Sequence, residues 1–258
     1  MGLWKGKRIL GNGASHLVRR RGGYVILGWL VVLLLGGCRL PTLLYFTAAM
    51  LGQDMRQPPE IDLLAYREKL NKSRSEPLRV AVVCYADIGT QIHLGPLPRE
   101  LTDTLARELA KGLAEHKDRL VILAPSAVYQ WQERQEQWST LNPSDMARDL
   151  GADLVIFVEL NRLSLYEGGS NRTLYRGRAE VQVTVAAAKS PTSDDLYHEL
   201  TQRAQLDVQY PRHAAPIAAD VDISPDRFRR QFVRHLAQMI AGLFLPRDPK
   251  DDLARDPI

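Results

Sequence analysis

The hydrophobic positions of residues 78–246 follow two periods, one typical of strands and one typical of helices. An unbroken apolar run at 80–85 predicts a strand covered on both faces. Leucines then recur at every fourth position and predict a helix with one buried face, namely Leu101, Leu105, Leu109 and Leu113. A second apolar run at 120–124 predicts another strand, which Pro125 ends.

The second half of this region predicts a helix, three antiparallel strands and a closing helix. Asn142-Pro143-Ser144-Asp145 is typical of a helix start, and Gly151 of its end. Alternating segments at 153–166 and 175–187 predict a hairpin with one solvent-exposed face, and 196–210 predicts a third strand. Ser224-Pro225-Asp226 is typical of the start of a last helix. Its hydrophobic stripe consists of Phe228, Phe232, Leu236, Ile240 and Leu243.

These elements predict an α/β fold with a mixed sheet of about five strands in the order β-α-β-α-β-β-β-α. We expect four regions along the chain. Residues 1–38 form a targeting segment with a membrane-targeting helix, 39–77 a tether with a short helix, 78–246 the α/β domain, and 247–258 a flexible tail.

The positive charge of the chain is concentrated at its amino terminus. The whole chain has 34 basic and 30 acidic residues, and six of the basic residues and none of the acidic ones lie in residues 1–38. The remainder therefore carries 34 − 6 = 28 basic against 30 acidic residues. This distribution indicates a targeting element and argues against a nucleic-acid-binding domain, whose basic residues would gather on a folded face.

An uncharged segment follows the arginine cluster at 19–21. Its apolar part, 24–37, has 14 residues, or about 21 Å of helix, which is short of the roughly 30 Å hydrocarbon layer of a bilayer. It matches the hydrophobic region of a secretory signal. The positive-inside rule then keeps the arginines in the cytoplasm and predicts that the rest of the chain lies on the periplasmic side.

Leu35, Gly36, Gly37 and Cys38 end this segment and resemble the lipobox of bacterial lipoproteins. The resemblance implies that signal cleavage leaves Cys38 as the first residue and that its sulfur carries lipid. The alternative is an uncleaved single-pass anchor, because about 21 residues precede the apolar segment where most signals have fewer. Either anchor makes membrane lipid a partner, through Cys38 or through the 24–37 helix.

Residues Met146 to Ile156 resemble the helix-to-strand signature of periplasmic lipoproteins related to the TolB amino-terminal domain and the curli-secretion lipoprotein. The resemblance extends over about residues 78–245 and implies a docking or regulatory module. The short 168–171 connection argues against a pore, since it adds no membrane-crossing strands. Segments 174–178 and 228–232 also resemble uncharacterised planctomycete-type lipoproteins.

Few residues suggest chemistry. The six histidines lack metal-motif spacing and no nucleotide loop follows a strand, so we expect no metal and no cofactor. Cys84 lies in an apolar strand and is expected to be a buried small side chain. His198 with Asp194 or Asp195 is the candidate for a catalytic group.

Two further patterns have alternative interpretations. The first is a basic stripe formed by Arg227, Arg230 and Arg234. In one interpretation, the aliphatic parts of these side chains cover apolar surface while the guanidinium groups stay in water. In the other, the guanidinium groups contact lipid headgroups or an acidic partner. Trp131 and Trp138 pack in the core or contact a partner.

The combined expectation is a membrane-anchored extracytoplasmic lipoprotein that acts without catalysis as a binding or scaffold module in cell-envelope assembly, with an envelope protein as partner. The alternative is a single-pass membrane protein with an extracytoplasmic enzyme domain. The sequence does not distinguish the inner from the outer membrane.

Overall fold

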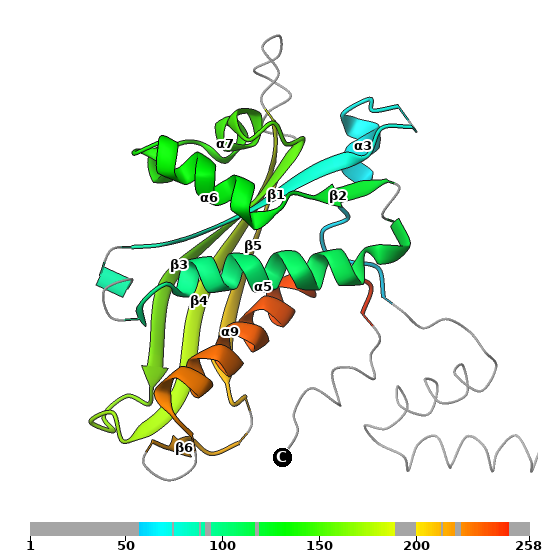
Figure 1. Cartoon of the computed structure of the whole chain (residues 1–258). Coiled ribbons are helices and arrows are strands. Elements are labelled where there is room, and N and C mark those ends of the chain that lie inside the picture. Colours follow the sequence, from blue (N-terminus) through cyan, green and yellow to red (C-terminus); the bar gives the residue numbers. More distant parts are fainter. Residues whose placement is uncertain are drawn as a thin grey trace, which may run out of the picture. The chain divides into compact units, whose positions relative to one another are not determined.

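A mixed sheet with helices on both faces forms the centre of the domain (Figure 1). The structure is a computed structural model that describes residues 57–73, 75–87, 89–90, 94–116, 119–188, 200–212, 214–219 and 223–247, all within the unit Arg56–Ile258. The predicted targeting segment 1–38 and most of the predicted tail lie outside the described residues.

The sheet has the strand order β2-β1-β3-β4-β5, with a short β6 paired to β4. The strands are β1 (Leu78–Ala86), β2 (Leu120–Ile122), β3 (Leu154–Tyr166), β4 (Leu174–Ala187), β5 (Thr201–Tyr210) and β6 (Ile217–Ala218). β1 is parallel to β2 and β3, whereas β4 is antiparallel to β3, β5 and β6. The predicted mixed α/β fold with about five strands is confirmed.

The helices agree with the predicted order and add to it. They are α3 (Ala65–Lys69), α5 (Leu97–Gly112), α6 (Pro125–Arg134), α7 (Pro143–Asp149) and α9 (Pro225–Ala241), with short 3-10 turns at Ala114–His116 and Trp138–Thr140. Pro125, expected only to end a strand, also occupies the first turn of α6, where its missing N–H has no helical partner to lose.

Two apolar clusters sandwich the parallel part of the sheet. Val80 and Val82 of β1 face α5 and α9, which lie side by side over one face of the sheet (Figure 1). Ala81 and Val83 face α6 and α7 on the other side. The prediction that this strand is covered on both faces is therefore correct.

The second face of the sheet is covered over only part of its area. Arg178 and Glu180 near the start of β4 reach solvent, as the alternation predicted, but Thr184 and Ala186 near its end are buried. The contact of α7 with β3 and β4 explains the difference. The predicted solvent-exposed face thus extends over the first half of β4 alone.

The segment before β1 also contributes to the core. Ile61, Leu63 and Tyr66 are almost fully buried, and the Ile61 N–H donates to the Leu243 carbonyl oxygen at 2.9 Å. Gln57 pairs with Arg247 in an antiparallel bridge. The region predicted as a tether over 39–77 therefore packs on the domain from Gln57 onward.

The Leu150-Gly151-Ala152-Asp153 turn positions β3 beside β1. Gly151 has a φ of +61°, the left-handed conformation that glycine adopts without a steric penalty. The Asp153 carboxylate accepts a hydrogen bond from the Arg79 backbone N–H at 2.7 Å and pairs with Lys72 at 2.6 Å. The predicted helix end at Gly151 is confirmed.

Candidate functional site

The basic stripe lies on the solvent side of α9. The Ser224 side chain accepts a hydrogen bond from the Arg227 backbone N–H at 3.4 Å and caps the helix as predicted. The opposite helix face buries the predicted apolar residues, so Arg227, Arg230 and Arg234 are exposed. Within the described part of the chain, none of the three guanidinium groups forms an ion pair. The stripe is a surface of three unneutralised positive charges.

Arg229 on the same helix has a different environment. Its guanidinium group pairs with Glu100 of α5 at 3.0 Å and donates to the Leu94 carbonyl oxygen at 3.3 Å. Its side chain is only 19% exposed. Arg229 therefore fastens α9 to the start of α5, and its charge does not extend the basic stripe.

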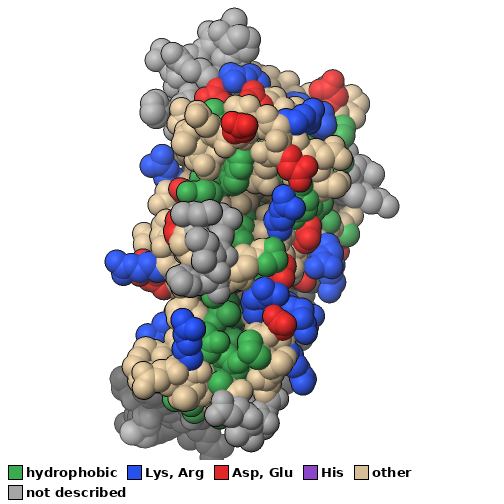
Figure 2. Space-filling view, turned by 60° about the vertical axis from the view of Figure 1, so that its left-hand side comes forward, with side chains coloured by type: hydrophobic (Ala, Val, Ile, Leu, Met, Phe, Trp, Pro, Cys, Tyr) green, Lys and Arg blue, Asp and Glu red, His purple; other side chains and the backbone are tan. Residues whose placement is uncertain are grey.

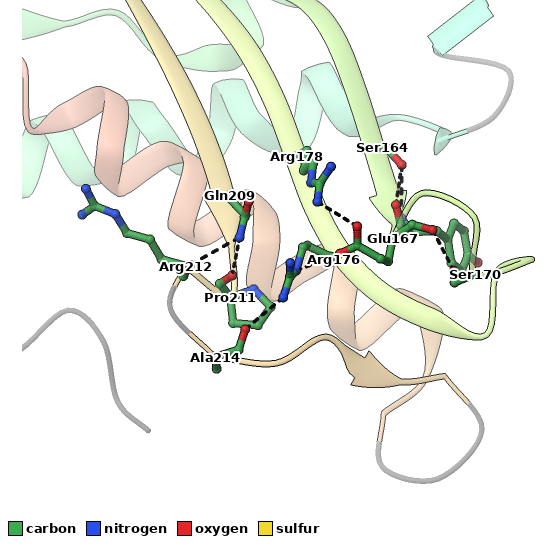
Figure 3. A network of polar contacts seen from close by, with 10 residues as sticks. Ser164, Glu167, Ser170, Arg176, Arg178, Gln209, Pro211, Arg212 and Ala214 are labelled. Carbon is green, nitrogen blue, oxygen red and sulfur yellow. Dashed lines mark hydrogen bonds and ion pairs between the residues drawn. The ribbon is translucent and has the colours of Figure 1, made fainter.

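A second group of charged residues surrounds the β3–β4 turn. Glu167 lies between two arginines of β4, with Arg178 at 2.8 Å and the Nε of Arg176 at 3.0 Å (Figure 3). The contact with Arg176 is an ion pair whose angle falls short of a hydrogen bond. Arg176 also donates to the Ala214 carbonyl oxygen at 3.1 Å, so the cluster connects the turn with the segment that follows β5.

The exposed half of the sheet forms a shallow trough of about 470 Å³ across β3, β4 and β5. Its polar lining consists of Arg162, Ser164, Arg178, Glu180, Asp207 and Gln209. Arg162 and Glu180 pair across β3 and β4 at 3.0 Å. On the face shown in Figure 2, basic and acidic side chains are likewise interspersed. A trough of this kind offers contacts of both signs to a partner.

A pocket of about 510 Å³ opens at the carboxyl end of β1. Thr102 and Arg99 of α5 line it together with Tyr129 and Glu133 of α6. Arg99 lies over the Tyr129 ring, 5.1 Å from its centroid, and pairs with Glu133 at 3.3 Å. In open α/β sheets the carboxyl ends of parallel strands are the usual place for a ligand, so this pocket is the candidate small-molecule site.

Two groups beside this pocket titrate well above neutral pH. Burial raises the pKa of the Cys84 thiol to about 12, and a hydrogen bond with Thr102 opposes the shift. Burial and the neighbouring Asp103 carboxylate raise the pKa of Tyr129, whose hydroxyl lies 2.8 Å from Asp103 Oδ1. Both groups stay protonated at pH 7, and the prediction that Cys84 is buried is confirmed.

The tryptophans belong to the second apolar cluster. Trp131 is 6% exposed and Trp138 packs edge-on against Tyr85, with ring centroids 5.7 Å apart. The core-packing interpretation is correct for Trp131.

Other predicted residues lie outside the part of the chain that the structure describes. They are Leu35, Gly36, Gly37, Cys38, Asp194, Asp195 and His198. In the described ranges no helix is long and apolar enough to span a bilayer, and no cluster of His, Cys, Asp or Glu has the geometry of a metal site.

Sequence reasoning missed the Glu167 cluster and the pocket at β1. Arg176 and Arg178 alternate with buried positions on β4, a signal that could have identified them as neighbours on one face. Arg99, Tyr129 and Glu133 come from two helices whose packing no local pattern indicates.

The described chain is thus an open mixed α/β domain with a half-exposed sheet. No protein-family model matches it, and no curated protein matches it. It is similar to the solved structure of the hypothetical protein CT253 from Chlamydia trachomatis, with 16% identity, 65% of this chain and 98% of that chain covered, and a TM-score of 0.36.

Two further solved structures are similar. A PelC dodecamer from Paraburkholderia phytofirmans has 12% identity, with 66% of this chain and 90% of that chain covered and a TM-score of 0.34. Lipoprotein GNA1162 from Neisseria meningitidis has 11% identity, with 64% of this chain and 99% of that chain covered and a TM-score of 0.31. The similar structures therefore include a bacterial lipoprotein.

Proposed function

We propose that this protein is a membrane-anchored extracytoplasmic lipoprotein whose α/β domain is a non-catalytic binding module, serving as a scaffold in cell-envelope assembly. The observation that carries the proposal is the order of features before the domain. Three arginines at 19–21, an uncharged apolar segment and Leu35-Gly36-Gly37-Cys38 follow one another as in a lipoprotein signal.

The exposed surfaces of the domain support a binding role. The sheet trough presents Arg162, Glu180 and Asp207 to solvent on a broad, shallow surface, and such surfaces suit protein partners better than they suit small substrates. The α9 stripe adds a positively charged surface, and we assign to it contact with anionic headgroups or an acidic envelope protein.

Replacing the lipidated residue tests the proposal. Cys38→Ala removes the only sulfur at the predicted cleavage site, so the variant should lose incorporation of a labelled fatty acid and move from the detergent phase to the aqueous phase in detergent partitioning. An acyl chain contributes about 0.8 kcal/mol per buried methylene, so this shift should be nearly complete.

Cys84→Ala is the matched control. Its thiol is buried in the domain, and this variant should keep both the label and the detergent partitioning of the wild type. A Cys38→Ala protein that remains in the detergent phase would contradict lipidation and favour the uncleaved single-pass anchor.

The second candidate is an extracytoplasmic enzyme domain, favoured by the pocket at the carboxyl end of β1. Arg99 is a cationic residue of its lining. A small molecule that raises the melting temperature of the wild type, and raises that of Arg99→Ala much less, would favour this candidate.

A further inference from the structure

β5 is an edge strand with a regular backbone. It pairs with β4 over ten consecutive positions, from Gly177↔Tyr210 to Ala186↔Thr201, without a register shift. No strand among the described residues pairs with its other edge. An edge strand of this length presents a row of backbone N–H and C=O groups to which another strand can bind.

Of the common protections of an edge strand, β5 has charged side chains, Arg203 and Asp207, but neither a proline, a lysine nor a bulge. Its sequence from Thr201 to Tyr210 has no proline and no lysine, and the β4–β5 pairing has no bulge. Exposed edges are usually blocked by one of these features. Among the described residues, neither a further strand nor a bulge blocks the β5 edge from Gln202 to Tyr210.

Two opposite charges stand four residues apart on the solvent-exposed side of β5. Arg203 and Asp207 are both exposed, and among the described residues neither side chain has a hydrogen bond or an ion pair. Burial raises the pKa of the Glu159 carboxyl on β3, and the charge of Arg203 is near enough to oppose that shift. Asp207 lies directly opposite Glu180, a second carboxylate, and like charges at opposite positions destabilise a sheet. Among the described residues, therefore, no cation pairs with Asp207.

We propose that β5 pairs antiparallel with β5 of a second copy of this chain, with Gln205 on the two-fold axis. In that register Arg203 lies opposite Asp207 of the partner subunit, and the symmetry repeats the pair. Opposite charges at directly facing positions stabilise antiparallel strands. Because the two copies contribute the same surface, the interface closes as a dimer.

The charges select this register over its neighbours. A symmetric shift by two residues in either direction keeps each side chain on its face but places Arg203 opposite Gln205 or Gln209 of the partner subunit. A shift by one residue moves the side chains to opposite faces. The register centred on Gln205 is therefore the one that pairs both charges.

A cysteine on the axis tests the register directly. Facing Cα atoms of antiparallel strands lie about 4.5 to 5.5 Å apart, within the roughly 4.4 to 6.8 Å range of disulfides. Full-length Gln205→Cys, purified in detergent and mildly oxidised, should therefore form a disulfide-linked dimer on a non-reducing gel. Wild type under the same oxidation controls for Cys38 and Cys84.

Gln182→Cys is the matched control. Gln182 lies beside Gln205 on the same face of the sheet, one strand inward, so its symmetry mate would be three strand spacings away, or about 14 Å. This variant should stay monomeric on the gel. Equal crosslinking of the two variants would overturn the proposed register, and crosslinking of Gln205→Cys to a different protein would overturn the choice of partner.

Exchanging the charges tests the interface in solution. Arg203→Asp and Asp207→Arg each place two like-charge pairs across the axis and should raise the dimer dissociation constant about tenfold, measured by light scattering of the full chain in detergent. The double variant restores both pairs in reverse and should recover the wild-type dimer, which a folding defect would not do.

A wild-type chain that is monomeric at every concentration, or a double variant as weak as the single ones, would overturn the proposal. The pairing does not depend on the proposed function. A monomer that incorporates lipid at Cys38 would refute the dimer alone, and a dimer without lipid would refute lipidation at Cys38 alone.

Discussion

Gly177 lies on β4 where the ring of Phe232 from α9 packs directly onto the strand. A Cβ atom at position 177 would lie 2.7 Å from Cε2 of that ring, well inside van der Waals contact, and Phe232 is fully buried. Close packing of this kind transmits any added volume to its neighbours. Glycine is therefore required here by the approach of an aromatic side chain.

Gly177→Ala should lower the free energy of unfolding by about 1 to 3 kcal/mol, the usual cost of overpacking a core. Either the ring leaves its rotamer or α9 moves away from the sheet. Urea denaturation followed by tryptophan fluorescence measures the change.

Gly168→Ala provides the comparison, because a Cβ atom at that turn residue meets nothing within 4 Å. Its stability should stay within about 0.5 kcal/mol of the wild type. Equal effects of the two alanines would show that backbone freedom, and not the Phe232 contact, determines the cost at Gly177.

At the scale of single residues, the sequence predicted the features that a local pattern of neighbouring residues indicates. The α9 stripe, the buried Cys84 and the left-handed Gly151 all have local signals. Gly177 and the pair of Arg99 with Glu133 have none, because their partners come from distant elements that meet only after packing.

At the scale of elements, Asp153 connects the beginning of β3 with the beginning of β1. Its carboxylate receives the Arg79 backbone N–H and the Lys72 ammonium group, and its own N–H donates to the Arg79 carbonyl oxygen at 2.8 Å. Both ionic side chains are about one fifth exposed. The residue thus holds the parallel pair in register.

Asp153→Ala should destabilise the domain by about 1 to 3 kcal/mol, because the Arg79 N–H loses its side-chain acceptor and Lys72 its counter-charge. Asp153→Asn keeps an acceptor oxygen and loses only the charge, so about half of that loss is expected. Thermal unfolding of both variants measures the difference. If the asparagine variant were as unstable as the alanine variant, the charge on Asp153 would be the important feature and the hydrogen bond to Arg79 would contribute little.

The elements that the sequence missed are short or atypical. β6 has two residues and β2 three, too few for an alternation to be recognised. α6 begins at Pro125 in a segment rich in Gln and Glu, where proline resembles a strand end as much as a helix start. The long strands and the two long amphipathic helices were predicted because their patterns repeat often enough to be recognised.

At the scale of the whole molecule, the predicted targeting segment 1–38 and the remainder of the chain differ in charge. The basic residues of 1–38 match the cytoplasmic side of a signal, while the remainder of the chain is nearly neutral. The α9 stripe is then a local positive surface on a domain without large net charge. Such a surface favours anionic lipid only when the three arginines act together.

A triple variant of a chain that begins at Arg56 should bind less tightly to vesicles containing anionic phosphatidylglycerol. Its substitutions are Arg227→Gln, Arg230→Gln and Arg234→Gln. Each basic residue near such a surface contributes about 1 kcal/mol, so the triple variant should bind roughly 100-fold less tightly, measured by vesicle cosedimentation at low salt. The matched control is a triple variant that removes the same charge from exposed positions on α5 and α6, namely Arg107→Gln, Lys111→Gln and Arg134→Gln. This control should bind nearly as well as wild type. Because exposed charges are screened by salt, the difference between the two variants should shrink as ionic strength rises. Equal loss in both triple variants would mean that net charge governs binding and that the α9 stripe has no special contact with lipid.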